Sequence, residues 1–103
     1  ANLFLVSQGQ VMTAPVSESV LPGITREAVL ELASALSITA QEMSLPVEAL
    51  SMVEEAFLTS SLLGIMPLTR VAGRPIGTGK PGLVTQQLMR TYDLLVKRET
   101  GAI

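Results

Sequence analysis

The 103-residue sequence contains no histidine and no cysteine. A Ser/His/Asp triad, a cysteine nucleophile with its histidine base and any zinc site with histidine or cysteine ligands are therefore excluded within this chain. Hydroxyls, carboxylates, lysines and backbone groups remain for chemistry. The absence of cysteine suits a reducing compartment, and we expect a cytoplasmic protein.

Positive charge and long apolar runs are also lacking. Seven Lys and Arg stand against nine Asp and Glu, for a net charge of −2 and a pI of about 5.0, so nucleic acid is not an expected partner. Although 48% of the residues are hydrophobic, no run approaches the roughly 18 apolar residues of a membrane span. We therefore expect a well-buried domain, with apolar surface that another segment or subunit covers.

The first half of the chain alternates between strand and helix patterns. Apolar runs at residues 3–6 and 10–13 predict a β-hairpin that turns at Gly9. Apolar residues spaced three, four and seven apart then predict an amphipathic helix, with Thr25 as its cap. Residues 38–44 alternate in polarity and predict a further strand.

The second half combines strands with a closing helix. Residues 46–49 predict a short helix, and residues 56–59 and 65–71 predict two strands around a tight turn at Ser60 and Ser61. A final amphipathic helix is indicated by apolar residues at helical spacing, namely Val84, Leu88, Tyr92 and Leu95. The sequence therefore predicts one mixed α/β (α+β) domain without internal repeats.

A glycine-containing loop at residues 21–26 leads into the first predicted helix. The first N–H groups of a helix lack intrahelical partners, and the helix dipole favours negative charge at that end. Gly23 allows close approach of a ligand, and the Thr25 hydroxyl is a further donor. The loop is thus an anion site in outline, with simple capping by Thr25 as the alternative.

A hydroxyl cluster, Thr59-Ser60-Ser61, lies between the two predicted strands. Consecutive hydroxyl residues at the end of a strand can form a phosphate-binding nest together with backbone N–H groups. They can equally form an ordinary turn whose side chains bond its own backbone. The residues alone leave both interpretations open.

Five segments in order, over nearly the whole chain, resemble the successive signatures of the class IV aminotransferases. This family contains branched-chain and D-amino-acid aminotransferases and aminodeoxychorismate lyase. The matching segments are residues 2–6, 21–26, 54–61, 64–68 and 77–82. The resemblance implies a pyridoxal 5′-phosphate enzyme of fold type IV, whose C-terminal domain is a β pseudo-barrel flanked by helices.

The resemblance also implies roles for particular residues. Leu21 would pack on the pyridine ring of the cofactor. The cofactor phosphate would be bound through backbone N–H and hydroxyl groups of Gly23, Ile24, Thr25, Ser60 and Ser61. The backbone N–H groups of Leu62 and Leu63 would receive the substrate carboxylate.

Other parts of the family's machinery have no counterpart in this chain. The lysine that forms the Schiff base and the glutamate that pairs with the pyridine nitrogen would both precede Ala1. Lys80 and Lys97 do not match that lysine, and we expect them to be surface charges. We therefore expect residues 1–103 to be a C-terminal, phosphate-binding fragment that begins at a cut, lacks its N-terminal domain and is inactive alone.

For the intact protein the resemblance implies amino-group transfer between an amino acid and a 2-oxo acid, in a homodimer. The alternatives are aminodeoxychorismate lyase, which eliminates pyruvate to give 4-aminobenzoate, and a stand-alone domain without catalysis. Three charged residues near the motifs are expected to be structural. Glu54 and Glu55 are adjacent and diverge in direction, so we expect a structural or interface role and not an acid/base pair. Arg26 is expected to pair with a carboxylate or to help order the start of the helix.

Overall fold

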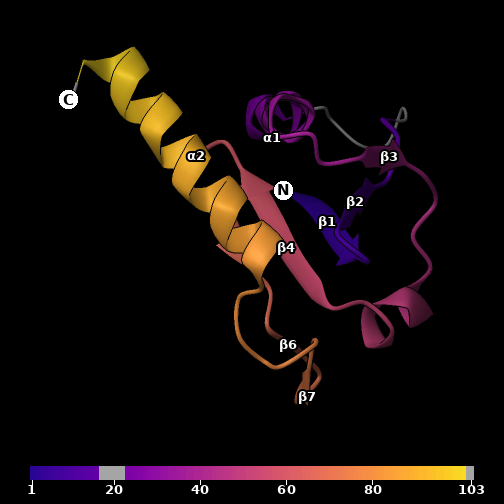
Figure 1. Cartoon of the computed structure of the whole chain (residues 1–103). Helices are drawn as coiled ribbons and strands as arrows, with labels where there is room; N and C mark the ends of the chain where they lie inside the picture. The colour runs from indigo at the N-terminus through magenta and orange to yellow at the C-terminus, as the bar shows by residue number, and fades with distance from the viewer. Residues whose placement is uncertain (17–22, 102–103) are drawn as a thin grey trace.

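The computed structural model describes residues 1–16 and 23–101 (Figure 1). Its α-helices are α1 (Ile24–Ala35) and α2 (Leu83–Thr100), and a 3-10 helix, η1, spans Val47–Ser51. The strands are β1 (Asn2–Ser7), β2 (Gln10–Thr13), β3 (Ala40–Glu42), β4 (Glu55–Ser60), β5 (Gly64–Pro67), β6 (Arg70–Val71) and β7 (Arg74–Pro75). The mixed α/β class predicted from the sequence is confirmed.

Five strands form one sheet in the order β3-β2-β1-β4-β5, and β6 and β7 form a separate two-stranded ribbon. All neighbours are antiparallel except β2 and β3. The predicted hairpin at β1 and β2 is confirmed: Gln8 and Gly9 both have positive φ, 53° and 74°, as a type I′ turn requires. The central strand β1 therefore lies between its hairpin partner and β4.

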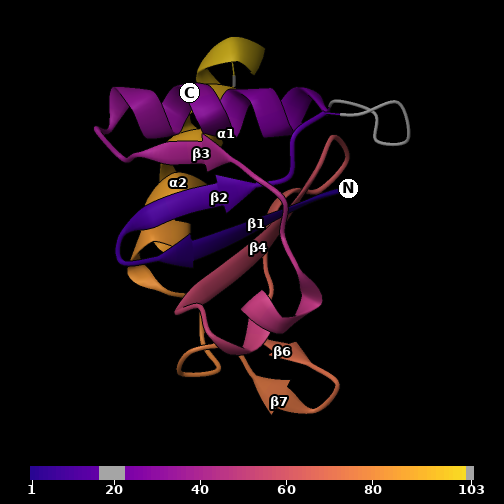
Figure 2. The ribbon, with the colours of Figure 1, turned by 90° about the vertical axis from the view of Figure 1, so that its right-hand side faces the viewer.

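Both α-helices cover one face of the sheet (Figure 2). Phe4 of β1 and Phe57 of β4 are register partners on that face, and their rings stack with centroids 4.9 Å apart. Val29 of α1 and Leu88 of α2 pack on them and are fully buried. This core fixes both helices against β4, the strand that ends at the candidate site.

The opposite face has a smaller apolar cluster. Leu5, Ala56, Val53 and Ile76 are buried there, with partly buried residues of η1 beside them. The β6–β7 ribbon extends from the end of the sheet away from α1 (Figure 1). Within residues 1–16 and 23–101, no helix is long and apolar enough to cross a membrane.

Two strands are shorter in the structure than the sequence predicts. The strand predicted at residues 38–44 is only β3, because the N–H of Ile38 bonds the carbonyl of Ala33 and so closes α1. The strand predicted at 65–71 divides into β5 and β6. The partner of β5 is β4, which begins at Glu55. Beyond the bond from the Leu68 N–H to the Ala56 carbonyl, only Glu55 of β4 is left to pair with, and the ladder ends.

Candidate functional site

A hollow of approximately 350 Å³ lies where the starts of β1 and α1 meet the end of β4. It is lined by residues 1–2, 23–26 and 59–61. Figure 2 shows these three segments gathered at one corner of the molecule. The structure thus brings together five predicted site residues that are distant in sequence, namely Gly23, Ile24, Thr25, Ser60 and Ser61.

The start of α1 contributes backbone donors to this hollow. Gly23 is the N-cap residue, and the first bond within the helix runs from the N–H of Glu27 to the Gly23 carbonyl, at 3.1 Å. The N–H groups of Ile24, Thr25 and Arg26 therefore have no acceptor within the helix, and the helix dipole adds partial positive charge. A Cβ at Gly23 would lie 2.9 Å from Oδ1 of Asn2, so glycine permits this close approach.

Thr25 is the second residue of the helix, and the prediction that it caps α1 is wrong. Its hydroxyl instead donates to the carbonyl oxygen of Ser60, at 3.0 Å, in a nearly inaccessible position. That bond ties the start of α1 to the end of β4. The hydroxyl has one proton, and this bond uses it. Thr25 can therefore donate to an anion only through its backbone N–H.

The end of β4 contributes hydroxyl groups. Oγ of Ser60 accepts hydrogen bonds from the N–H groups of Leu62 and Leu63, at 3.2 and 3.4 Å, so Ser60 stabilises its own turn. As an acceptor in both bonds, the Ser60 hydroxyl keeps its proton for another partner. Ser61 is exposed and makes no side-chain hydrogen bond within the described part of the chain. The strand includes Ser60, so the turn begins one residue later than predicted.

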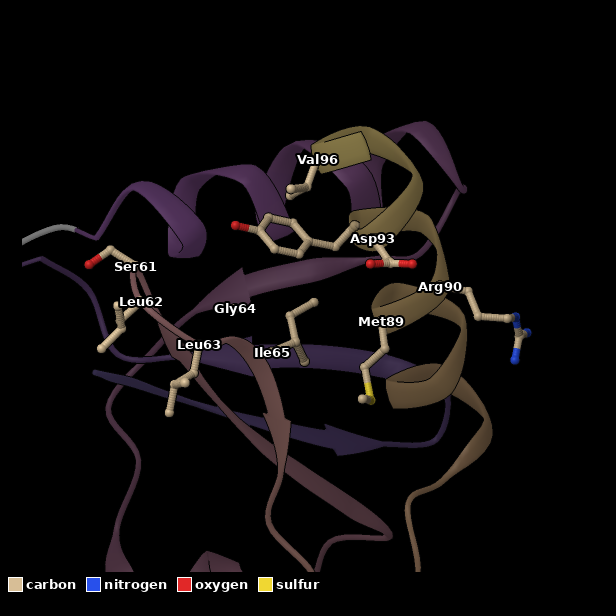
Figure 3. Close-up of a pocket in the computed structure, with 10 residues that line it drawn as sticks. Ser61, Leu62, Leu63, Gly64, Ile65, Met89, Arg90, Asp93 and Val96 are labelled. Atoms are coloured by element: carbon tan, nitrogen blue, oxygen red, sulfur yellow. The ribbon is translucent and has the colours of Figure 1, made fainter. Parts of the chain in front are cut away.

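Leu62 and Leu63 stand at the tip of this turn, 87% and 65% exposed. Both residues line a second hollow of approximately 550 Å³, which lies between the turn and α2 (Figure 3). The long bonds from their N–H groups to Ser60 are weaker than ideal ones. A carboxylate that approaches the tip of the turn would compete only with these two bonds for the N–H groups of Leu62 and Leu63.

The remaining predicted residues lie outside this geometry. Leu21 belongs to the part of the chain outside the described residues. Lys80 is exposed, and Lys97 forms a half-exposed ion pair of 3.0 Å with Asp93, so both are surface charges as predicted. Among residues 1–16 and 23–101, no group of three or more acidic side chains is arranged to hold a metal ion.

The glycine-rich segment at residues 77–82 serves packing and does not line the hollow. Gly77 lies against the carbonyl of Glu54, and Gly82 lies against the side chain of Glu55, with no room for a Cβ at either position. The carboxylate of Glu55 in turn accepts hydrogen bonds from the start of α2. The expected structural role is therefore confirmed for Glu55, and the backbone of Glu54 packs against the same segment.

Arg26 is 1% exposed and binds acceptors on three segments. Its guanidinium contacts Glu27 at 3.0 Å, the carbonyl of Ala14 at 3.0 Å and Glu42 at 3.3 Å. The expected pairing with a carboxylate is confirmed. This cation holds the start of α1 against β3 and against Ala14, which follows β2, and both of its terminal nitrogens make contacts.

Sequence reasoning missed two residues that shape the hollow, Asn2 and Tyr92. The sequence places Asn2 only at the start of a family signature, ahead of the predicted strand, and Tyr92 only at one position of an apolar helical stripe. The Tyr92 hydroxyl lies 3.2 Å from Oγ1 of Thr25. No local signal indicates that contact, because the two residues are 67 positions apart.

Comparison with known families gives a match over most of the chain. The family model described as amino-transferase class IV matches residues 1–71. The branched-chain-amino-acid aminotransferase of Escherichia coli K12 is 37% identical over 99 residues, which cover 96% of this chain and 32% of that protein. The D-alanine aminotransferase of Bacillus licheniformis is 30% identical over 101 residues, covering 98% of this chain and 36% of that protein.

Solved structures show the same relationship in three dimensions. The Escherichia coli branched-chain amino acid aminotransferase superposes with a TM-score of 0.88 over 91% of this chain and 32% of that one, at 37% identity. A T.th. branched-chain amino acid aminotransferase complexed with N-(5′-phosphopyridoxyl)-L-glutamate gives a TM-score of 0.84 over 88% of this chain and 31% of that one, at 33% identity. The chain therefore shares both its fold and its sequence signatures with these aminotransferases.

Proposed function

The chain belongs to the amino-transferase class IV family, and we propose that the protein containing it transfers an amino group between an amino acid and a 2-oxo acid, with pyridoxal 5′-phosphate as cofactor. The chain spans about a third of the length of the curated relatives it matches. We therefore propose that residues 1–103 form the C-terminal, phosphate-binding part of the enzyme. The Schiff-base lysine would be supplied by a preceding segment.

The observation that carries this proposal is the hollow at the start of α1. Backbone N–H groups of Ile24 and Thr25 and hydroxyls of Ser60 and Ser61 border it, and the N-terminus of a helix favours an anion there. A phosphate dianion suits such a set because it accepts several hydrogen bonds at once. Because Gly23 has no side chain, the start of α1 can lie close to the Asn2 side chain at this hollow.

When bound, pyridoxal phosphate supplies the electron sink for the reaction, and this chain's residues hold its phosphate end in place. Ile24 and Thr25 donate from the helix, and Ser60 and Ser61 donate from the turn. Leu21 would pack against the ring. The fit is supported by a relative solved with a phosphopyridoxyl compound.

The substrate would approach the tip of the turn. The N–H groups of Leu62 and Leu63 make only long, weak hydrogen bonds to Ser60 and would exchange them for a substrate carboxylate. Their exposed side chains give that side of the site an apolar character, which suits an aliphatic amino acid. We further propose a homodimer, because the exposed leucines need a covering surface. We also propose a cytoplasmic location, because a chain without cysteine suits a reducing compartment.

Cofactor binding by the complete protein tests the site assignment. Ser61→Ala removes a hydroxyl that can donate to the phosphate, and we expect the dissociation constant for pyridoxal 5′-phosphate to rise about tenfold or more. Ser51→Ala is the matched control, since that exposed hydroxyl bonds only the Glu48 carbonyl within the described residues. Equal cofactor affinity of the Ser61 variant and the unaltered protein would remove Ser61 from the site.

Activity is tested with a panel of amino donors in the same protein. Branched-chain L-amino acids, D-alanine and aminodeoxychorismate are offered with a 2-oxo acid, and transfer to the oxo acid is measured. We expect transfer from at least one aliphatic donor. Release of pyruvate from aminodeoxychorismate without transfer would identify a lyase, and absence of both cofactor binding and turnover would identify a domain without catalysis.

A further inference from the structure

Tyr92 reaches the candidate site from a helix that does not itself line the hollow. It lies on α2, and its hydroxyl oxygen is 3.2 Å from Oγ1 of Thr25 at the start of α1. Thr25 is 1% exposed, so water has little access to this contact. A hydrogen bond in such a position is stronger than one in water.

The direction of this bond follows from the number of protons. The Thr25 hydroxyl has one, and its bond to the carbonyl oxygen of Ser60 uses it. The Tyr92 hydroxyl is then the donor toward Oγ1 of Thr25. A continuous series runs from Tyr92 through Thr25 to the Ser60 carbonyl, and it connects α2, α1 and the end of β4.

The ring of Tyr92 contacts the backbone just after the turn, at Gly64. Gly64 follows the turn with φ of 73°, and a Cβ there would lie 3.1 Å from Cε2 of Tyr92. Glycine therefore lets the aromatic ring lie directly on the backbone at the end of the turn. Tyr92 thus contacts the start of α1 with its hydroxyl and the turn that carries Ser61 with its ring.

We propose that Tyr92 is a positioning residue for the cofactor phosphate: it fixes the spacing between the N–H groups at the start of α1 and the hydroxyls of Ser60 and Ser61. The proposal rests on the proposed function. Two sets of donors can bind one phosphate group together only when their separation matches it, so loosening one set lowers affinity without removing any donor.

The test uses the complete protein loaded with pyridoxal 5′-phosphate. Tyr92→Phe keeps the ring on Gly64 and removes only the hydroxyl. We expect the dissociation constant for the cofactor to rise about threefold to tenfold, as for loss of one hydrogen bond. The phosphorus NMR signal of the bound phosphate should shift or broaden as well, which a change in overall stability alone would not cause.

A double-mutant cycle with Thr25→Val separates positioning from general stability. If Tyr92 acts through Thr25, Tyr92→Phe has little further effect on cofactor affinity once Thr25 is Val, so the two changes are not additive. The matched control is Thr91→Val, which removes a neighbouring hydroxyl of α2 that bonds the Gln87 carbonyl. It should leave both the affinity and the phosphorus signal unchanged.

Each outcome decides the proposal. Unchanged affinity and phosphorus signal in Tyr92→Phe, or fully additive effects in the cycle, overturn the role of Tyr92 and leave the proposed function standing. Failure of the unaltered protein to bind pyridoxal 5′-phosphate overturns the proposed function, and the positioning role with it. The role is established if Tyr92→Phe weakens cofactor binding in the unaltered background and has little effect once Thr25 is Val.

Discussion

The carboxylate of Glu55, at the start of β4, accepts a hydrogen bond of 2.8 Å from the backbone N–H of Thr85 in the first turn of α2. Its second oxygen accepts one of 3.2 Å from the N–H of Val84. The first turn of α2 has no acidic residue, and its N-cap residue, Gly82, offers no side chain. The sheet therefore supplies the negative charge that the start of this helix lacks.

Replacing Glu55 with Ala should destabilise the protein by about 1–2 kcal/mol, because two N–H groups lose their acceptors and the helix loses a charge near its N-terminus. Urea unfolding of the two proteins measures the difference. Glu31→Ala, at an exposed position on α1, serves as control and should change little. Equal losses in the two variants would show that Glu55 is not a cap.

Gly77→Ala should be much more costly than Gly73→Ala. Both glycines have positive φ, 58° and 78°, where an alanine costs about 1–2 kcal/mol in backbone strain. At Gly73 nothing lies within 4 Å of an added Cβ, whereas at Gly77 it would overlap the backbone of Glu54. The difference in unfolding free energy between the variants measures that contact, and similar values would show that the loop simply moves aside.

Arg26→Met should lower the unfolding free energy by about 1–3 kcal/mol. The change keeps an apolar stem and removes a buried cation that contacts Glu27, Glu42 and the Ala14 carbonyl. The loss stays below that for a fully buried pair because both carboxylates are about half exposed and can be hydrated. Arg98→Met, at an exposed position on α2, is the control. A stability equal to that of the control would mean that the contacts of Arg26 contribute nothing net.

Glu54 makes a small pH-dependent contribution to stability. The backbone N–H of Gln8 donates to its carboxylate at 2.7 Å, and this bond lowers the pKa of Glu54 below its ordinary value of 4.5. The contribution is therefore present above the unfolded-state pKa and is lost as pH falls through the lower folded-state pKa.

Glu54→Gln should remove that dependence. The difference in unfolding midpoint between the unaltered protein and the variant should be largest near neutral pH and shrink as pH falls below about 4.5. Denaturant titrations across the acidic range give the comparison. A difference that stays constant with pH would mean that the carboxylate does not gain charge-specific stabilisation from Gln8.

Local patterns predicted the elements whose signals lie within a few residues. The β1–β2 hairpin follows from two apolar runs around a glycine, and α2 follows from apolar residues at helical spacing. Strand ends were predicted less well, because a strand stops where its partner stops. Because β4 begins at Glu55, its pairing with β5 ends near Leu68. Because the Ile38 N–H bonds the Ala33 carbonyl at the end of α1, β3 starts later than predicted.

The candidate site shows the same division. The resemblance to the class IV aminotransferases implied that Ile24, Thr25, Ser60 and Ser61 act together, and the structure places all four around one hollow. The sequence by itself determined the helix and strand patterns, the missing histidine and cysteine chemistry and the family signatures. Each of these is written in residue types and short spacings.

Only the tertiary structure decided how those motifs are joined. The Thr25 hydroxyl does not cap α1 but donates to the Ser60 carbonyl, 35 positions away. The Tyr92 hydroxyl contacts Thr25 across 67 positions. Glu55 capped α2 from 30 positions upstream of Thr85. Such contacts form when the sheet packs against both helices, and hydrogen bonds between distant segments leave no periodic trace in the chain.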